Sequence, residues 1–389
     1  MIPCPVCSRP DTVPLLTLTR MPLLECVFSE SRQEALDVEC GTIDLVLCPE
    51  CSHIYNRAFE PERIKYMDGY ENALGFSPRH RAYLSEKVDH LIRTYQLQNK
   101  SIVEIGCGNA DFISLLCDRG GNHGIGYDPS QQSRTFRIGS GSVEVRAEHF
   151  TAIDQVQTVD FVCSQHVLEH LETLPATLRR ARSILRPEGA GYFEVPDGLA
   201  IVRDWHIWDL TYEHVSYFSP MSLRRALSDA GFSVMQVGSS FGGQYLHAEV
   251  DLAGDDKAAP TSLAPDGEAV VIKHISAAFS AGLHRWKERM SGLIAGGHRI
   301  VVWGAGTKAV SFLNMLGISA DKGLEYVVDI NPRKKGRFLP GMAQQITSPD
   351  FLREYRPEIV VVMNKEYEGE IQSMLESMDL QCDLLIASP

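Results

Sequence analysis

The chain of 389 residues is long for a single hydrophobic core, so we expect two or three domains. Its formal net charge of −13 argues against a nucleic-acid partner, because phosphate backbones are bound by clustered Lys and Arg. No apolar run approaches the roughly 20 residues that span a bilayer, and the start of the chain lacks the charged and apolar regions of a signal peptide. We therefore expect a cytoplasmic protein with no membrane partner.

Two CxxC pairs stand near the start of the chain, separated by about forty residues of strand-rich sequence; they are Cys4 with Cys7 and Cys48 with Cys51. In a cytoplasmic protein such pairs favour a metal over disulfides. Four thiolates suit tetrahedral Zn²⁺ and leave no open coordination position, so the site would be structural. We predict a small zinc ribbon. His53 is a conceivable further ligand, but the four cysteines make it unnecessary.

A loop rich in Tyr, Gly and Pro follows, from Tyr66 to Pro78, and a helical pattern runs from about Arg79 to Tyr95. A loop with two tyrosines directly before a ligand-binding domain could act as a lid that places Tyr70 over a substrate. Packing of these rings between two domains is an equally good interpretation.

The segment from Ser101 to Asp111 predicts a strand that runs into a glycine turn at Gly106-Cys107-Gly108, where missing side chains let a helix start close to a ligand. A second strand ends in Asp128, the position at which an acid binds the hydroxyls of an adenosine ribose. The third glycine of the dinucleotide fingerprint is missing, and Glu104 with Asp111 suits a cationic ligand. The segment resembles the first motif of class I S-adenosylmethionine-dependent methyltransferases. A doubly wound domain with another ligand is the alternative.

Strands and helices alternate from Ser101 to about Val250, which predicts a doubly wound α/β domain with a parallel sheet. The expected strands are Ile102–Ile105, Gly124–Tyr127, Val143–Arg146, Val159–Ser164 and Gly191–Val195. Ligands of the domain should lie beyond the carboxyl ends of these strands. We expect Leu168 and Leu171 to face the core. The expected cofactor-binding residues are Glu104, Gly106, Cys107, Gly108, Asn109, Asp128, Glu148 and Gln165.

The loop after the fifth strand is dense in aromatic and titratable residues and includes an adjoining Glu-His pair, Glu213 and His214, which favours function. Removal of a proton next to a ketone requires a base and donors that hold the developing oxyanion. The candidates for these roles are His214, Glu213, His166, His170, Tyr70 and Tyr212.

A polar linker is expected from Asp251 to about Glu268, and a long helical pattern then runs to about Ala295. A second strand and glycine turn follow at Gly304-Ala-Gly306, and another strand ends in Asp329, so the chain carries a second Rossmann-like unit. This turn also lacks the third glycine, which gives NAD weak support, and Lys308 could instead hold a phosphate.

In this order, the motifs resemble those of bacterial sugar C-methyltransferases that act on nucleotide-linked keto-deoxysugars. The resemblance implies a zinc-binding domain at 1–65, a methyltransferase domain at 66–253 and a Rossmann-like domain at 254–389. It further implies that a base, favoured to be His214, removes a proton next to the sugar ketone and that the enolate attacks the methyl group of S-adenosylmethionine. This chain has Thr211-Tyr212-Glu213-His214 where the family usually has Tyr-His-Glu-His.

The expected partner is a small-molecule substrate, a nucleotide sugar, and the expected assembly is a monomer or homodimer. Other interpretations are an O- or N-methyltransferase on a polar natural product, a binding module without catalysis, and an NAD-dependent enzyme that uses the last domain.

Overall fold

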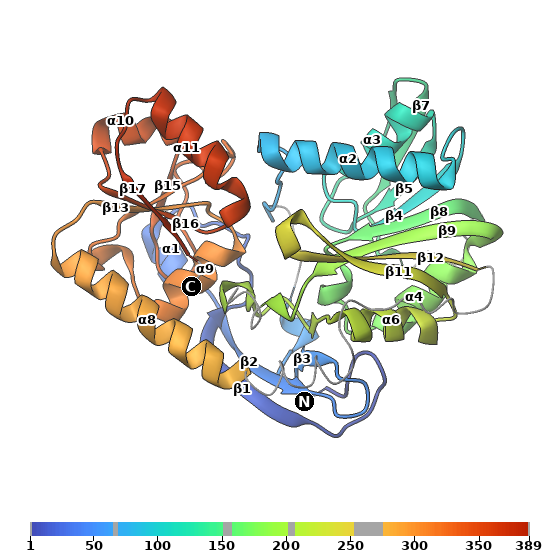
Figure 1. Cartoon of the computed structure of the whole chain (residues 1–389), viewed down its shortest axis with the longest axis horizontal. Coiled ribbons are helices and arrows are strands. Elements are labelled where there is room, and N and C mark those ends of the chain that lie inside the picture. Colours follow the sequence, from blue (N-terminus) through green and yellow to red (C-terminus); the bar gives the residue numbers. More distant parts are fainter. Residues whose placement is uncertain (1, 65–68, 151–157, 201–206, 253–274, 388–389) are drawn as a thin grey trace.

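The computed structural model describes residues 2–64, 69–150, 158–200, 207–252 and 275–387, whose strands form three sheets. Figure 1 shows two lobes side by side, with the N-terminal strands below and between them. The predicted linker after Asp251 and the lid residue Tyr66 lie outside the described residues.

The N-terminal sheet is antiparallel and has four strands, in the order β1 (Val13–Pro22), β2 (Cys40–Leu47), β3 (Ile54–Asn56) and β10 (Ser216–Tyr217). Two short helices accompany it, α1 (Arg32–Leu36) and η1 (Pro61–Arg63). Its last strand comes from far along the chain, from the loop that carries the Glu-His pair. The N-terminal sheet is therefore fixed directly to that loop.

The central sheet has eight strands, in the order β11 (Ser233–Ser240), β12 (Tyr245–Asp251), β9 (Leu185–Pro196), β8 (Val159–Gln165), β4 (Ser101–Ile105), β5 (His123–Tyr127), β7 (Gly141–Arg146) and β6 (Arg134–Ile138). The five strands predicted from the sequence are the five parallel ones, β9, β8, β4, β5 and β7. β12 and β6 run antiparallel to these five strands, and β11 pairs antiparallel with β12, which the alternation of strands and helices did not predict. Short connections explain the pairs β6 with β7 and β11 with β12, because a hairpin joins only antiparallel neighbours, whereas β12 pairs with β9 across a long connection.

Helices cover both faces of the central sheet, with α2 (Pro78–Tyr95) and α3 (Asp111–Gly120) on one face and α4 (Leu174–Ser183) and α6 (Pro220–Asp229) on the other (Figure 1). The predicted helix before the glycine turn is confirmed. Ser77 caps α2 by accepting a hydrogen bond from the His80 backbone N–H, and Pro78 occupies its first turn. Leu84, Val88 and Leu91 form its buried stripe.

The C-terminal lobe is a second Rossmann-like unit, as predicted. Its five parallel strands are β15 (Gln345–Thr347), β14 (Tyr326–Val328), β13 (Ile300–Trp303), β16 (Ile359–Val362) and β17 (Asp383–Ile386), in that order. The helices around it are α8 (Ile275–Ala295), α9 (Thr307–Leu316), α10 (Leu352–Tyr355) and α11 (Glu368–Ser377). No described helix combines the length and apolar character required to cross a membrane.

The N-terminal sheet, the loop after β9 and the C-terminal lobe share a hydrophobic core. One continuous cluster of buried side chains includes Leu45 of β2, Trp208 of the short helix η4 (Ile207–Asp209) and Phe312 of α9. The rings of Trp208 and Phe312 lie 4.7 Å apart, and the Trp208 indole N–H donates a hydrogen bond of 2.6 Å to the backbone carbonyl of Ala387. This packing fixes the C-terminal lobe against the loop after β9.

Candidate active site

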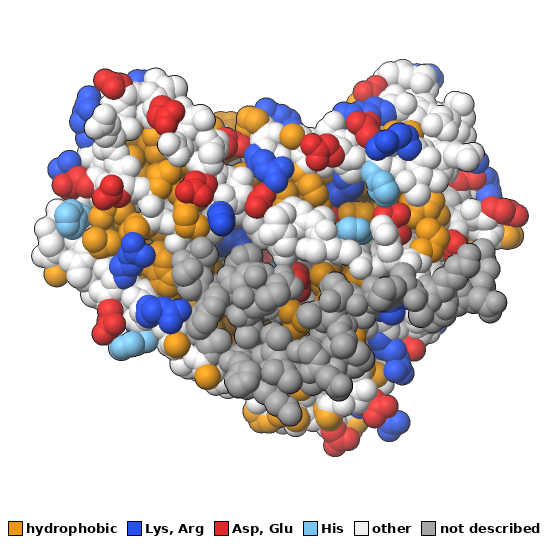
Figure 2. Space-filling model, viewed as in Figure 1, with side chains coloured by type: hydrophobic (Ala, Val, Ile, Leu, Met, Phe, Trp, Pro, Cys, Tyr) orange, Lys and Arg blue, Asp and Glu red, His pale blue; other side chains and the backbone are white. Residues whose placement is uncertain are grey.

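A cavity of about 770 Å³ lies between the two lobes. Its walls come from the carboxyl ends of β4, β5 and β8 in the central sheet and of β13 and β14 in the C-terminal sheet. Figure 2 shows the surface dipping between the two lobes on this face of the molecule. Because parallel sheets bind ligands beyond the carboxyl ends of their strands, this cavity is the candidate active site.

The glycine turn after β4 forms one wall of the cavity, and both of its glycines are required. Gly106 has a φ of +70°, and a Cβ there would come within 2.1 Å of Val167 Cγ2. Gly108 has a φ of +49°, and a Cβ there would meet open space. The turn therefore leaves its backbone accessible to a ligand. Seven of the eight predicted cofactor residues line the cavity, and they are Glu104, Gly106, Cys107, Gly108, Asn109, Asp128 and Gln165.

Asp128 holds the turn in place from the end of β5. Its Oδ2 accepts a hydrogen bond of 2.8 Å from the Gly108 backbone N–H, and its Oδ1 accepts one of 2.9 Å from the Ser130 N–H. Glu104 lies beneath the turn, where burial raises its pKa well above the ordinary value. A cation in the cavity would favour the ionised form of Glu104.

Gln165 ends β8 at the cavity wall, and its Nε2 is buried without a hydrogen-bond partner among the described residues. An amide donor in this state is suited to a polar ligand atom. Leu168 is fully buried as predicted, and Leu171 packs against the same core cluster but is only partly buried and also lines the cavity.

Glu148 was placed wrongly by the sequence analysis. Its side chain is exposed and does not line the cavity, whereas His149 and Phe150 do. The Glu148 backbone N–H donates a 2.9 Å hydrogen bond to the Arg146 carbonyl, so the chain turns as β7 ends. This turn directs the carboxylate to solvent.

Glu213 connects the predicted lid to the Glu-His pair. It is buried, its Oε1 accepts a 2.6 Å hydrogen bond from the Glu25 backbone N–H, and its Oε2 accepts one of 2.7 Å from the Tyr70 hydroxyl. Tyr70 and Glu213 both line the cavity. The Tyr70 phenol therefore lies in the candidate active site and does not only pack between two domains.

Tyr212 was also placed wrongly as a catalytic candidate. It is fully buried away from the cavity, its hydroxyl accepts a 3.1 Å hydrogen bond from the Glu60 N–H, and its ring packs on Phe59. A Cβ on Gly41 would lie 2.3 Å from the ring, so β2 has a glycine where Tyr212 docks. Thr211, which stands next to it, lines the cavity instead.

His170 and His214 face each other at the cavity wall, with ring centroids 4.8 Å apart. The His170 Nδ1 lies 3.1 Å from the Glu213 carbonyl oxygen, and because a carbonyl only accepts, Nδ1 carries the hydrogen. Burial lowers the pKa of His170 to about 4 and the pKa of His214 well below the ordinary value. Both rings are therefore neutral at pH 7 and have a nitrogen able to accept a proton.

His166 adopts the left-handed backbone conformation, with a φ of +53°, which is strained for a residue other than glycine. Its Nε2 lies 3.4 Å from Glu194 Oε1 and its Nδ1 lies 3.8 Å from Glu169 Oε1. Glu194 also accepts hydrogen bonds from Lys87 Nζ and the Tyr192 hydroxyl, each of 2.6 Å.

The sequence analysis missed Glu169, which lines the cavity, and the buried ion pair of Glu194 and Lys87 next to His166. Lys87 gave one signal that could have revealed it, because a lysine stands there between the apolar positions Leu84 and Val88 of the buried stripe of α2. A charged residue on an apolar face requires a buried partner, which is Glu194.

A second buried carboxyl group, that of Glu25, lies next to Glu213. Ser311 Oγ lies 2.9 Å from the Leu210 carbonyl oxygen and 3.1 and 3.2 Å from the two carboxyl oxygens of Glu25. The Ser311 hydroxyl is positioned to donate to the Glu25 carboxyl, and this donor partly offsets the cost of burying the carboxyl group. Burial, and then the charge of Glu213, raise the pKa of Glu25 well above its ordinary value.

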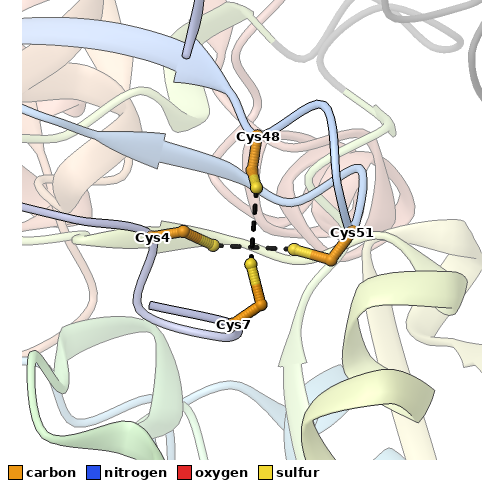
Figure 3. Close-up of side chains that lie close together, drawn as sticks. All are labelled: Cys4, Cys7, Cys48 and Cys51. Atoms are coloured by element: carbon orange, nitrogen blue, oxygen red, sulfur yellow. Dashed lines mark hydrogen bonds between the residues drawn. The ribbon is translucent and has the colours of Figure 1, made fainter. Parts of the chain in front are cut away.

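The four predicted zinc ligands converge on one point (Figure 3). The Cys4 and Cys51 sulfurs lie 3.5 Å apart, as do those of Cys7 and Cys48, and all four lie within 4.8 Å of one another. A tetrahedron with Zn–S bonds of about 2.3 Å has an edge of about 3.8 Å, so these residues fit Zn²⁺. None of them lines the cavity, and His53 lies elsewhere, 3.0 Å from Ser216 Oγ.

The second glycine turn repeats the geometry of the first. Asp329, at the end of β14, accepts a 2.8 Å hydrogen bond from the Ala305 N–H with its Oδ2 and one of 2.8 Å from the Asn331 N–H with its Oδ1. Here Lys334 Nζ also lies 3.2 Å from Asp329, and Lys308 Nζ is paired with Asp209 at 2.7 Å. Asp329 and Lys308 therefore each have a partner of opposite charge within the chain, although both residues line the cavity.

Comparisons with known families match two parts of the chain. Residues 78–237 match a family described as a methyltransferase domain, and residues 274–387 match one described as a C-methyltransferase C-terminal domain. The chain is similar to the C-methyltransferase NovU of Streptomyces niveus, with 22% identity over 386 residues that cover 95% of this chain and 90% of the relative.

Solved structures align with less of the chain. A methyltransferase of Clostridium acetobutylicum is 9% identical with a TM-score of 0.36, over 44% of this chain and 92% of that one. Magnesium protoporphyrin IX methyltransferase of Synechocystis is 19% identical with a TM-score of 0.35, over 48% of this chain and 90% of that one.

Proposed function

We propose that this chain, an S-adenosylmethionine-dependent methyltransferase with the C-terminal domain of C-methyltransferases, methylates a carbon atom next to the ketone of a nucleotide-linked keto-deoxysugar. The observation that carries the proposal is the pair of neutral histidines, His170 and His214, on the wall of a cavity that also contains the cofactor turn. Carbon methylation requires a base within reach of the methyl donor, and this arrangement supplies one.

The cofactor would be held by the turn after β4. Asp128 is the candidate for the ribose hydroxyls, and Glu104 and Asp111 also line the cavity, where a bound cation would favour their ionised forms. S-adenosylmethionine, when bound, supplies a methyl group on a positively charged sulfur. Its transfer neutralises charge, so positioning of the two reactants matters more than acid strength.

In this proposal His214 removes the proton next to the ketone. The base must be neutral before it acts, which agrees with the lowered pKa of His214. The Tyr70 hydroxyl is the candidate donor to the oxygen on which charge develops, once its proton turns from Glu213 to the substrate. Glu213 would position Tyr70 and His170, because its side chain accepts a hydrogen bond from Tyr70 and its backbone carbonyl accepts one from His170.

Proton removal can be measured separately from methyl transfer. In D₂O, with S-adenosylhomocysteine in place of the methyl donor, the wild-type protein should exchange the α hydrogen of a suitable keto sugar nucleotide for deuterium. His214→Asn keeps a similar shape but has no basic nitrogen, so exchange and methylation should both fall by about 10²-fold or more.

Two outcomes would change the proposal. If His214→Asn keeps full exchange while His166→Asn or His170→Asn abolishes it, the base lies on the loop after β8. If no keto sugar exchanges and labelled methyl groups appear on oxygen or nitrogen of another acceptor, the protein is an O- or N-methyltransferase. Mass spectrometry of a cell extract incubated with the protein and methyl-labelled S-adenosylmethionine would identify the product.

A further inference from the structure

We propose that Glu169, His170 and His214 form a binding site for a divalent transition-metal ion on the wall of the active-site cavity. We further infer that this ion inhibits methyl transfer by occupying the nitrogen that acts as the base. The binding stands independently of the proposed function, whereas the inhibition rests on it.

The three residues offer one ligand atom each, and these atoms lie within 4.8 Å of one another. The His170 Nε2 and Glu169 Oε1 atoms lie 4.0 Å apart. A tetrahedral ion with bonds of about 2.1 Å to nitrogen and oxygen has ligand atoms about 3.4 Å apart. Small rotations of these side chains would therefore close a coordination shell.

Glu169 supplies an independent indication of a ligand. Its side chain is 1% exposed, and its Oε2 is buried without a hydrogen-bond partner among the described residues. A buried carboxylate oxygen without a partner is costly, and an ion is one of the few groups that satisfies it. The residue lines the cavity, so an ion can reach it from solvent.

The orientation of His170 is also that of a metal ligand. Histidines that bind metals usually donate their other ring N–H to a carbonyl or carboxylate, which fixes the tautomer. The His170 Nδ1–H donates to the Glu213 carbonyl, and this bond directs Nε2 toward Glu169 and the ring of His214.

The ligand chemistry selects the ion. Two imidazoles and one carboxylate suit Zn²⁺, Co²⁺ or Ni²⁺, whereas Ca²⁺ and Mg²⁺ prefer oxygen ligands. Three protein ligands would leave a position open toward the cavity, as three protein ligands do in catalytic zinc sites. A nitrogen of His214 that binds the ion has no lone pair left to accept the substrate proton, so binding and base catalysis exclude each other.

Binding should be measured with Co²⁺ on protein whose cysteine site already holds zinc. Visible ligand-field absorption without the near-ultraviolet band of cobalt–thiolate would place Co²⁺ away from the cysteines, with one equivalent bound per chain. Glu169→Gln and His170→Gln should each weaken Co²⁺ binding by at least about 10-fold, which is the loss typical even for residues that only orient a metal ligand. His149→Gln is the matched control, because His149 lines the same cavity outside the cluster, and it should bind Co²⁺ as the wild type does.

Absence of this absorption, a thiolate band alone, or unchanged affinity in both variants would overturn the metal site. Thermal unfolding of each variant without Co²⁺ would separate a lost ligand from a lost fold. For the second part, Zn²⁺ should inhibit methyl transfer by wild type at the concentrations at which it displaces Co²⁺. Binding without inhibition, or activation by the ion, would overturn the competition. If no keto sugar is methylated at all, the proposed function fails, and the Co²⁺ measurement still decides the site.

Discussion

The buried carboxyl group of Glu25 should make the stability of the protein fall as pH rises. Burial, and then the charge of Glu213, raise the pKa of this carboxyl well above the ordinary value, although the Ser311 hydroxyl donates a hydrogen bond to it. Between the pKa of glutamate in the unfolded chain, about 4.3, and this raised value, the folded state binds the extra proton. The free energy of unfolding therefore falls as pH rises through that window. The stability contributed by the extra proton is fully present only below the window.

Glu25→Gln tests this reasoning, because a glutamine keeps the shape and is neutral at every pH. One pKa unit corresponds to about 1.4 kcal/mol. The free energy of unfolding of the variant minus that of the wild type should therefore rise by about 1.4 kcal/mol per pH unit within the window, or about 2.7 kcal/mol from pH 5 to pH 7 if the window extends that far.

Urea unfolding followed by tryptophan fluorescence is a suitable assay, because Trp208 packs against the helix that carries Ser311. Glu86→Gln makes the same chemical change at an exposed position of α2 and serves as the control. A difference between Glu25→Gln and wild type that stays constant from pH 5 to pH 7 would refute a protonated Glu25.

Three further predictions concern the metal, the cofactor and the two tyrosines. The protein should contain about one zinc per chain, and Cys48→Ser should lower both the zinc content and the yield of folded protein; a fully folded protein without metal would contradict this. Asp128→Ala should lose about 2–3 kcal/mol of affinity for S-adenosylmethionine in calorimetry, since a charge-assisted hydrogen-bond pair is lost, and Asp329→Ala in the second turn should lose none. Tyr212→Phe should cost about 1 kcal/mol of stability and leave turnover unchanged, whereas Tyr70→Phe should lower turnover; equal effects of the two on turnover would show that the cavity assignment is wrong.

The elements that the sequence predicted well have causes close together in the chain. An apolar run, a glycine turn and an acid about twenty residues later predicted β4, β5 and the position of Asp128, because each of these features depends on its own neighbours. The spacing of the CxxC pairs predicted that Cys4, Cys7, Cys48 and Cys51 would converge, since a tight turn presents both of its thiols to one point.

The outer strands of the central sheet and the partners of the buried charges were decided by tertiary structure. Glu213 binds the backbone of Glu25, 188 residues earlier, and Glu194 binds Lys87 across 107 residues. Neither residue has a local pattern that specifies its partner. A buried charge requires a partner, but any of many charged residues in the chain could satisfy that requirement.

The segment from Thr211 to His214 shows the limit most clearly. The sequence identified this segment as part of the site but did not specify which of its side chains enter the cavity, because an irregular loop has no fixed period of alternation. Thr211, Glu213 and His214 face the cavity, and Tyr212 faces away from it. The physical reason is the docking of the Tyr212 ring onto Gly41, in a space that exists only once the N-terminal sheet has packed against this loop.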